Sequence, residues 1–336
     1  MICSPIHDPE SRPPMRAALL AWYRRHRRAL PWRATRDPYR IWVSEIMLQQ
    51  TRVNAVLEHY RRFLRRFPDV PALARARLSS VLAAWSGLGY YRRARALHAA
   101  ARLLVRDFEG EFPRTAEGLR ALPGIGRYTA AAIASIAFAE PQAVVDGNVE
   151  RILGRLAGRH LPAAQAWGLA AQLLDRDHPG DFNQAMMELG ATTCLPREPR
   201  CARCPVARWC RSRGALARAA TPPRRRAQAA YRLALRDGAV LLRRRPASVS
   251  LMPGMWELPA ARPQRDPGSS VLLRLRHSIT TTDYQVTVLR SQRGAAGGTR
   301  WVRRSRLSGL PLTGLARKIL QRFGLLGNPI KRKRRS

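Results

Sequence analysis

The chain has 336 residues, enough for two domains, and 46% of them are hydrophobic, an ordinary share for a globular protein. Its longest apolar run, 130–139, is about half of the roughly 20 residues that a membrane-spanning helix needs, and no signal-peptide pattern opens the sequence. We therefore expect a monomeric cytoplasmic protein, with no membrane attachment.

The charge is strongly basic, with 61 Lys and Arg residues against 22 Asp and Glu and a formal net charge of +39. Only Lys318, Lys331 and Lys333 are lysines, so part of this charge reflects the codon usage of a GC-rich genome, which we expect to be bacterial. The remaining excess favours a polyanion partner, because cations that neutralise phosphates release counterions. We expect nucleic acid to be the binding partner, and the protein to be associated with the nucleoid.

The first two thirds of the chain show helical periodicity. Residues 1–14 are expected to be disordered and residues 15–218 to form an all-α domain. Apolar residues recur at spacings of three and four over 53–67. A second helix is expected at 79–85 with a Ser cap, and a third after the Gly break at 87–89.

The last third changes to strand periodicity. Residues 219–228 are rich in Pro and Arg and read as a linker. Apolar and polar residues then alternate over 231–235, Asp237-Gly238 predicts a hairpin turn, and alternation returns over 284–290 before a helix at 311–320. We expect a small α+β domain at 229–325 and a basic tail at 326–336.

Four cysteines lie close together in the spacing C-x6-C-x2-C-x5-C. Four thiolates hold either a tetrahedral zinc or a 4Fe–4S cube. Only one pair is as close as in a zinc knuckle, and one compact loop with unequal gaps suits the larger cube, so we favour iron–sulfur and keep zinc as the alternative. The predicted ligands are Cys194, Cys201, Cys204 and Cys210.

The stretch "LPGIGRYTAAAIASIAFAEPQAVVDGN", residues 122–148, joins a Gly-bracketed turn to an apolar helix and then to one acid, Asp146. Gly124 and Gly126 allow a turn whose amides, at a helix N-terminus, can face a phosphate, although an ordinary helix–helix turn has the same glycines. Asp146 could simply cap the next helix, or cap it and face a pocket as well. Asn148 could hydrogen-bond the carboxylate.

Glu45 is the candidate partner of Asp146. It lies in "DPYRIWVSEIMLQQTR", 37–52, among apolar neighbours. Apolar surroundings disfavour the charged carboxylate, so such a group can carry a proton near neutrality. Cleavage of a glycosidic bond commonly uses one acid to protonate the leaving group and another to stabilise the cation. The alternative is a Glu on the surface of an amphipathic helix.

Several motifs appear in one order over about 15–215: "LPWR" (30–33), "DPYRIWVSEIMLQQT", "WSGLGYYRRARALH" (85–98), "LPGIGRYTAAAI", "VVDGNVERIL" and "FNQAMMELGATTC" (182–194). With the cysteine spacing they resemble the MutY family of adenine DNA glycosylases, in the endonuclease III and helix–hairpin–helix superfamily. The resemblance implies a helical glycosylase domain with an iron–sulfur loop at 194–210. It implies base excision repair of adenine opposite 8-oxoguanine, and of adenine opposite guanine, in double-stranded DNA.

The resemblance also implies roles for single residues. Glu45 would protonate N7 of the flipped adenine, Asp146 would stabilise the sugar cation, and Tyr128 and Asn148 would position Asp146. Extrusion of the base is required because the reacting atoms are inaccessible inside a duplex. The resemblance further implies DNA contacts by Gln50, Tyr90, Gly124, Gly126, Arg127 and Thr280, and an adenine pocket lined by Trp32, Arg33 and Glu188. A helix-surface position is the alternative for Glu188.

Tyr128 separates this chain from the endonuclease III relatives, which carry a Lys there that attacks the sugar and leads to strand cleavage. No Lys occurs before Lys318, so we expect a monofunctional glycosylase that leaves the abasic site uncut.

The C-terminal part resembles that family's Nudix-like recognition domain, beginning at "LMPGMWELP" (251–259). The family's Phe-Ser-His signature becomes Ile279, Thr280 and Thr281 in our alignment, so Thr280 keeps a hydroxyl and the His is lost unless His277 replaces it. The strength of 8-oxoguanine discrimination is therefore left open. Asp266 is the lone acid where a Nudix enzyme binds Mg²⁺, which excludes pyrophosphate hydrolysis.

Two other functions stay open on the sequence. One is an iron–sulfur protein that scans DNA without catalysis, and the other is a zinc-bound structural DNA-binding protein. The sequence leaves open the catalytic rate, a covalent or ionic role of Asp146, and any partner of the basic tail.

Overall fold

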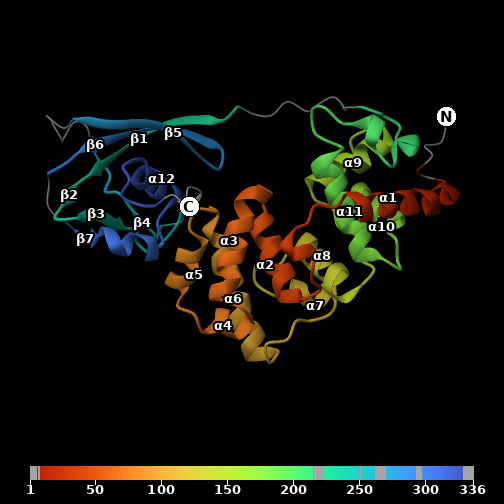
Figure 1. The fold of residues 1–336 in the computed structure, drawn as a ribbon, viewed down its shortest axis with the longest axis horizontal. Coiled ribbons are helices and arrows are strands. Elements are labelled where there is room, and N and C mark those ends of the chain that lie inside the picture. The colour runs from red at the N-terminus through yellow and green to blue at the C-terminus, as the bar shows by residue number, and fades with distance from the viewer. Residues whose placement is uncertain are drawn as a thin grey trace, which may run out of the picture. The chain divides into compact units, whose positions relative to one another are not determined.

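The computed structural model describes residues 6, 8–214, 216, 223–249, 251–261, 270–292 and 297–327. The chain divides into two compact units (Figure 1). The first contains residues 1–74 and 99–219, and the second contains residues 75–98 and 220–336. The predicted domains divide the chain near 219, whereas here the helical residues 75–98 belong to the C-terminal unit.

Helices are the regular elements of the described residues in the first unit, as its periodicity predicts. Short 3-10 turns at Pro9–Ser11, Pro31–Arg33, Cys201–Arg203 and Ala207–Trp209 connect or precede the longer helices. These helices are α1 (Arg12–His26), α2 (Pro38–Leu48), α3 (Val53–Arg66), α4 (Val70–Arg75), α7 (Ala116–Arg120), α8 (Arg127–Phe138), α9 (Gly147–Ala157), α10 (Ala163–Leu173) and α11 (Pro179–Thr192). Helix α6 (Tyr91–Asp107) begins in the second unit and ends in the first.

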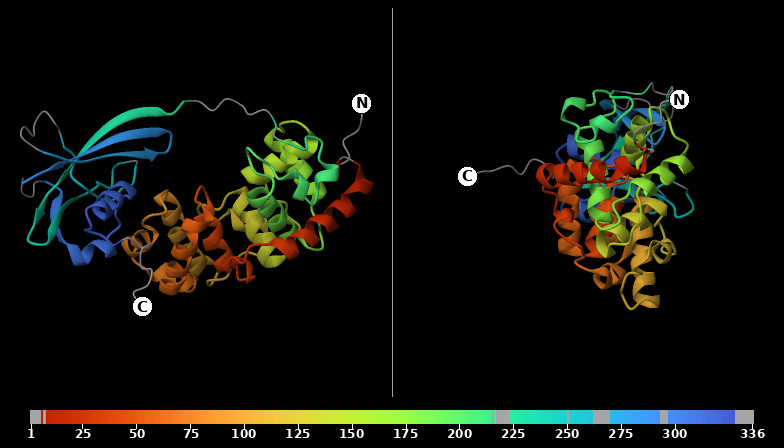
Figure 2. Two further views of the ribbon diagram at one scale, coloured as in Figure 1. Left: turned by 45° about the horizontal axis from the view of Figure 1, so that its top comes forward. Right: turned by 90° about the vertical axis from the view of Figure 1, so that its right-hand side faces the viewer.

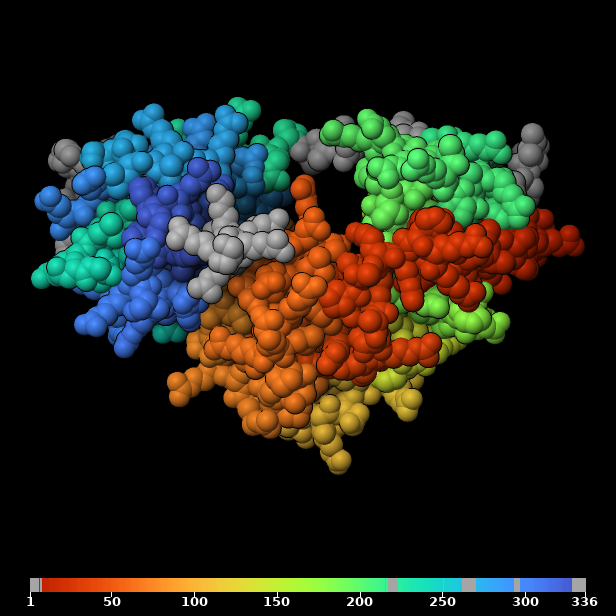
Figure 3. Space-filling view, in the orientation of Figure 1, coloured from red at the N-terminus to blue at the C-terminus, as the bar shows by residue number. Residues whose placement is uncertain are grey.

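Helix α11 organises the core of the first unit, because it packs against α1, α8 and α9. Met15, Leu19 and Tyr23 of α1 are at most 1% exposed and join this core, while the other side of α1 forms part of the molecular surface (Figure 3). Gly180 allows the close approach of α11 to α8, since a Cβ there would lie 2.7 Å from the carbonyl oxygen of Ser135. The packing places residues of α2, α8, α9 and α11 side by side.

The Gly-bracketed turn is a helix–hairpin–helix element. Helix α7 ends at Arg120, and α8 begins at Arg127 with Gly126 as its N-cap. Gly124 has a φ of 78°, in the left-handed region that glycine adopts without strain. Side-chain capping is absent at Gly126, so the first amides of α8 have no side-chain acceptor at that cap.

The second unit contains α5 (Leu78–Trp85), the start of α6, two small sheets and α12 (Gly314–Arg322). One sheet has the order β1-β6-β5, from Arg225–Leu233, Thr282–Arg290 and Val271–Ile279, with β1 and β6 parallel. The other joins β2 (Leu235–Arg236), β3 (Ala239–Arg244), β4 (Trp256–Glu257) and β7 (Thr299–Arg303). A 3-10 turn, Arg304–Gly309, precedes α12 (Figures 1 and 2). The apolar residues of α12 pack with those of both sheets.

The predicted hairpin is confirmed. Arg236 pairs with Ala239, so Asp237 and Gly238 form a two-residue turn with φ angles of 49° and 69°. Positive φ at both positions is the type I′ geometry that Asp-Gly favours.

Three predicted boundaries differ from the structure. Helix α1 begins at Arg12 and Ile6 is 1% exposed, so disorder does not extend to residue 14; the prolines 13 and 14 fit a first helical turn. Helix α5 begins at Leu78 behind Arg77, without a side-chain cap, so Ser79 lies inside the helix. Strand β1 begins at Arg225, within the predicted linker.

Other predictions fall outside the described residues: those for residues 1–5 and 7, for 215, 217 and 218 at the end of the helical domain, for 219–222 of the linker, for Asp266 and for 328–336 of the tail. Within the part of the chain that is described, no helix combines the length and the apolar character that a bilayer crossing requires.

Candidate active site and cysteine loop

A cavity of about 550 Å³ in the first unit is lined by residues from α2, α8, α9 and α11. Glu45 and Asp146, a hundred positions apart in the sequence, both line it. So do the other residues predicted for catalysis or the adenine pocket, and one of the predicted DNA contacts: Tyr128, Asn148, Glu188, Trp32, Arg33 and Gln50.

Glu45 lies on α2 and is 6% exposed, which excludes the alternative of a surface Glu. Burial raises the pKa of its carboxyl group to about 7; the Tyr128 hydrogen bond opposes this rise and the charge of Asp146 adds to it. The Tyr128 hydroxyl donates to Oε2 of Glu45 over 2.9 Å. That Tyr128 positions Asp146 stays a prediction, and the structure adds this hydrogen bond to the other acid.

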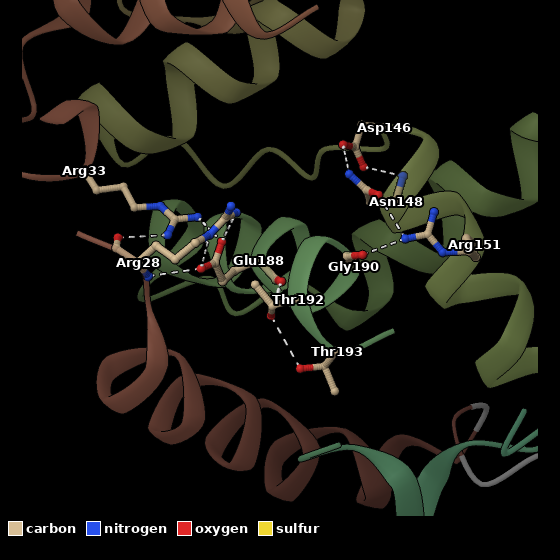
Figure 4. Close-up of polar contacts among 9 residues, drawn as sticks. All are labelled: Arg28, Arg33, Asp146, Asn148, Arg151, Glu188, Gly190, Thr192 and Thr193. Carbon is tan, nitrogen blue, oxygen red and sulfur yellow. Dashed lines mark hydrogen bonds and ion pairs between the residues drawn. The ribbon is translucent and has the colours of Figure 1, made fainter. Parts of the chain in front are cut away.

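Asp146 caps α9 and faces the cavity, so both interpretations of this residue hold together. Its Oδ1 accepts from the backbone amides of Asn148 and Val149 over 2.9 and 2.7 Å. Its Oδ2 accepts from the side-chain amide of Asn148 over 3.1 Å, as predicted (Figure 4). Three N–H donors therefore fix the orientation of this carboxylate.

Glu188 lies on α11 with a fully buried side chain, so the surface alternative for it is wrong. Oε1 accepts from the amide and Nε of Arg28, and each guanidinium of Arg28 and Arg33 donates to Oε2 over 2.7 Å (Figure 4). Burial alone would raise the pKa of Glu188, but the hydrogen bonds from Arg28 and Arg33 lower it to about 2. Among the carboxyl groups that line the cavity, Glu188 therefore stays ionised at neutral pH, whereas Glu45 can carry a proton.

Arg151 of α9 links Asn148 to α11 and to the cysteine loop by hydrogen bonds. Its guanidinium donates to Oδ1 of Asn148, to the carbonyl of Gly190 and to the carbonyl of Cys194, over 2.9, 2.7 and 3.0 Å. Figure 4 shows Arg151 beside Asn148 and Gly190. Gly190 is required here, since a Cβ would lie 2.5 Å from the Cβ of Asn148.

The four cysteines lie in the loop that follows α11, and none forms a disulfide. Cys194, Cys204 and Cys210 pack against the core of the first unit, and Arg155, 3% exposed, donates to Sγ of Cys194 over 3.1 Å. Among the described residues, no group of three or more Cys, His, Asp or Glu side chains is arranged to hold a metal ion. The donor set itself, four thiols with an N–H donor to one sulfur, has the chemistry that suits a cluster.

The remaining predicted DNA contacts lie outside the cavity lining. The Arg127 guanidinium stacks 3.9 Å over the ring of Trp167. Tyr90, in the second unit, is 47% exposed. Thr280 lies in the turn between β5 and β6 with a φ of 49°, and its hydroxyl donates to the carbonyl of Ile279. His277 is half-buried within β5, and burial lowers its pKa.

Arg28 and Arg151 are site residues that the sequence reasoning missed. Arg28 precedes "LPWR" by two positions, and nothing in a run of arginines marks it as the partner of a residue 160 positions away. Arg151 lies three residues after Asn148 on α9, and that helical spacing was a usable signal for the contact.

Comparison with known proteins agrees with the fold. Residues 43–165 match the family described as HhH-GPD superfamily base excision DNA repair protein. A solved thermostable thymine-DNA glycosylase is 31% identical, with a TM-score of 0.57, covering 60% of this chain and 96% of that one. An endonuclease III trapped as a covalent intermediate with DNA has a TM-score of 0.54 and 21% identity, covering 61% and 97%, which shows the fold alone.

Curated relatives match a similar share of the chain. The human protein named adenine DNA glycosylase is 49% identical over 213 residues, 59% of this chain and 39% of the relative. The protein of that name from Buchnera aphidicola subsp. Baizongia pistaciae is 39% identical over 199 residues, 58% and 57% of the two chains. The match therefore spans about two fifths of the human relative and under three fifths of the bacterial one.

The hairpin between α7 and α8 and the acid-lined cavity of the same unit define a helix–hairpin–helix protein. The chain belongs to the HhH-GPD superfamily of base excision DNA repair proteins. The resemblance to adenine DNA glycosylases expected from its motifs is confirmed by these relatives.

Proposed function

We propose that the protein is a monofunctional adenine DNA glycosylase, which hydrolyses the N-glycosidic bond of adenine opposite 8-oxoguanine or guanine. The observation that carries the proposal is the convergence of Glu45 and Asp146 on one cavity, with a pKa of about 7 for Glu45. The curated relatives named adenine DNA glycosylase support the choice of base.

Glu45 would act as the general acid. A carboxyl group with a pKa near 7 is about half protonated at neutral pH and still donates readily. Tyr128 donates to Oε2, which leaves Oε1 to carry the proton toward N7 of the flipped adenine. Protonation at N7 lets the C1′–N9 bond break with its electron pair going to N9, so the base leaves neutral.

Asp146 would stabilise the positive charge that develops on the sugar. Because three N–H donors orient its carboxylate, the negative charge is in place before the bond breaks. Water then adds to C1′ and loses its proton to a carboxylate, giving an abasic site and free adenine. Tyr128 stands where a Schiff-base lysine would act, so the strand would stay intact.

Glu188 would select the base. Its carboxylate is held by Arg28 and Arg33, and an ionised carboxylate accepts a hydrogen bond from an exocyclic amine such as that of adenine. Trp32, 6% exposed, would supply an apolar wall for the flipped ring. DNA would be held by Gln50, Tyr90, Arg127 and the amides of the Gly124–Gly126 turn.

Cys194, Cys201, Cys204 and Cys210 would hold a 4Fe–4S cluster, which when bound cross-links the loop to the core of the first unit. The α+β residues 229–325 would form a Nudix-like recognition domain that presents Thr280 to the opposite base. The protein would act as a monomer in the bacterial cytoplasm.

The test is base release from a duplex that carries adenine opposite 8-oxoguanine. With wild type, the adenine-containing strand should break only when hot alkali follows the reaction. With Glu45→Gln or Asp146→Asn, the strand should stay intact even after alkali. Breakage without alkali would indicate a lyase instead. Tight binding with no release by the wild type would leave only a DNA-scanning role.

A further inference from the structure

The Tyr90 loop, defined as Ser86–Tyr91, presents an exposed aromatic ring on a strained backbone. Tyr90 is 47% exposed and has a φ of 48°, in the left-handed region that few residues other than Gly adopt. Gly87 and Gly89 also have positive φ, at 111° and 73°. Such a conformation persists where the surroundings determine it, so the contacts of the loop are informative.

Part of the support comes from the adjoining helices. The Arg93 guanidinium lies 5.3 Å from the ring of Tyr90 and 5.5 Å from the ring of Trp85, and so stacks with both. The Trp85 indole donates to the carbonyl of Gly89 over 3.1 Å. These contacts orient the ring of Tyr90, but they do not fix the two ends of the loop.

The two ends are held by C-terminal residues of the same unit. The hydroxyls of Ser86 and Tyr91 both donate to the carbonyl of Leu312, over 3.1 and 2.8 Å. Arg317 of α12 donates to the Ser86 hydroxyl over 3.0 Å. Ser86, Tyr91 and Leu312 are at most 4% exposed, so these hydrogen bonds are shielded from water.

Leu312 is itself held rigidly. Its side chain is fully buried in the core of the second unit. Its two neighbours bond to Trp256 of β4: the Trp256 amide donates to Pro311, and the Thr313 amide donates to the Trp256 carbonyl, over 2.8 and 2.9 Å. One carbonyl anchored to a sheet therefore fixes both ends of the Tyr90 loop.

We propose that the Leu312 carbonyl and Arg317 are positioning groups for Tyr90, which makes the C-terminal residues act on DNA through this loop. The occupant is a base of the duplex, which stacks on the exposed Tyr90 ring. The inference rests on the proposed function in one respect, that Tyr90 contacts DNA. It assigns to the C-terminal part a role separate from reading the opposite base.

The experiment is a double-mutant cycle on the full chain with Tyr91→Phe and Tyr90→Ala. The duplex carries a non-hydrolysable 2′-fluoro adenosine opposite 8-oxoguanine, and the measured quantity is its Kd. Removing one hydrogen bond from the Leu312 carbonyl should weaken binding about fivefold. When Tyr90→Ala is already present, adding Tyr91→Phe should change the Kd less than twofold, because the effect of Tyr91 on binding requires the ring of Tyr90.

The matched control is Tyr39→Phe, because the hydroxyl of Tyr39 also donates to a backbone carbonyl, that of Phe67, over 2.7 Å, and Tyr39 is equally buried. It should lower the melting temperature as Tyr91→Phe does and leave the Kd unchanged. Ser86→Ala, which also removes one hydrogen-bond acceptor of Arg317, should repeat the coupling seen with Tyr91→Phe.

The inference is overturned if Tyr91→Phe weakens binding equally with and without Tyr90, or has no effect on binding. Failure of the proposed function has a different signature, namely no release of ordinary adenine by the wild type, and the binding cycle can be read independently of it.

Discussion

Gly190→Ala is a small change that should damage catalysis from a position outside the cavity lining. The added Cβ would lie 2.5 Å from the Cβ of Asn148 and 3.3 Å from a guanidinium nitrogen of Arg151. Carbon atoms pack at about 3.5–4.0 Å, so Asn148 and its helix have to move by about 1 Å. Asn148 holds Oδ2 of Asp146, and Asp146 is therefore displaced as well.

The size of the effect follows from this displacement. A misplacement of about 1 Å in a catalytic group costs roughly 100-fold in rate. Overpacking of this kind lowers the free energy of unfolding by about 1–3 kcal/mol. The chemical step should therefore suffer more than the fold.

The assay is single-turnover release of adenine, with urea unfolding of the same samples. The control is Gly168→Ala on α10, where an added Cβ meets nothing within 4 Å. Gly168→Ala should raise stability by about 0.5–1 kcal/mol and leave the rate unchanged. A wild-type rate for Gly190→Ala in folded protein would refute the role of Asn148 in holding Asp146.

Three further changes have defined outcomes. Glu188→Gln leaves Arg33 buried without its anion and should lower the free energy of unfolding by about 3 kcal/mol, measured in urea at neutral pH. Because the folded pKa of Glu188, about 2, lies below its ordinary 4.5, wild type should lose this contribution as pH falls from 4.5 toward 2. Arg127→Ala should reduce the slope of log K against log salt by about one if Arg127 contacts a phosphate. Cys204→Ala should remove the visible absorbance of thiolate-bound iron and lower the melting temperature, whereas a colourless wild type containing zinc would contradict the cluster.

Local features of the fold were predictable because neighbouring residues determine them. The apolar spacing of 53–67 predicts α3, and Asp237-Gly238 predicts the hairpin turn. Asp146 was predictable as a helix cap for the same reason, since its partners are the amides of Asn148 and Val149.

Contacts between distant segments were less accessible. The burial of Glu188 was not predictable, because its partners Arg28 and Arg33 lie about 160 positions away in a run of arginines. The hydroxyl of Tyr128 contacts Glu45 on another helix, and only packing decides which acid it reaches. The assignment of residues 75–98 to the C-terminal unit likewise follows from long-range packing that periodicity does not encode.

The pH dependence of adenine release tests most directly whether Glu45 protonates the leaving base in the two-acid site. In wild type the single-turnover rate constant should be level below about pH 7 and fall about tenfold per pH unit above it, as Glu45 loses its proton. Glu45→Gln should be far slower and lack this decline. A wild-type rate that stays level well above pH 7, or the same decline in Glu45→Gln, would contradict protonation of the leaving base by Glu45.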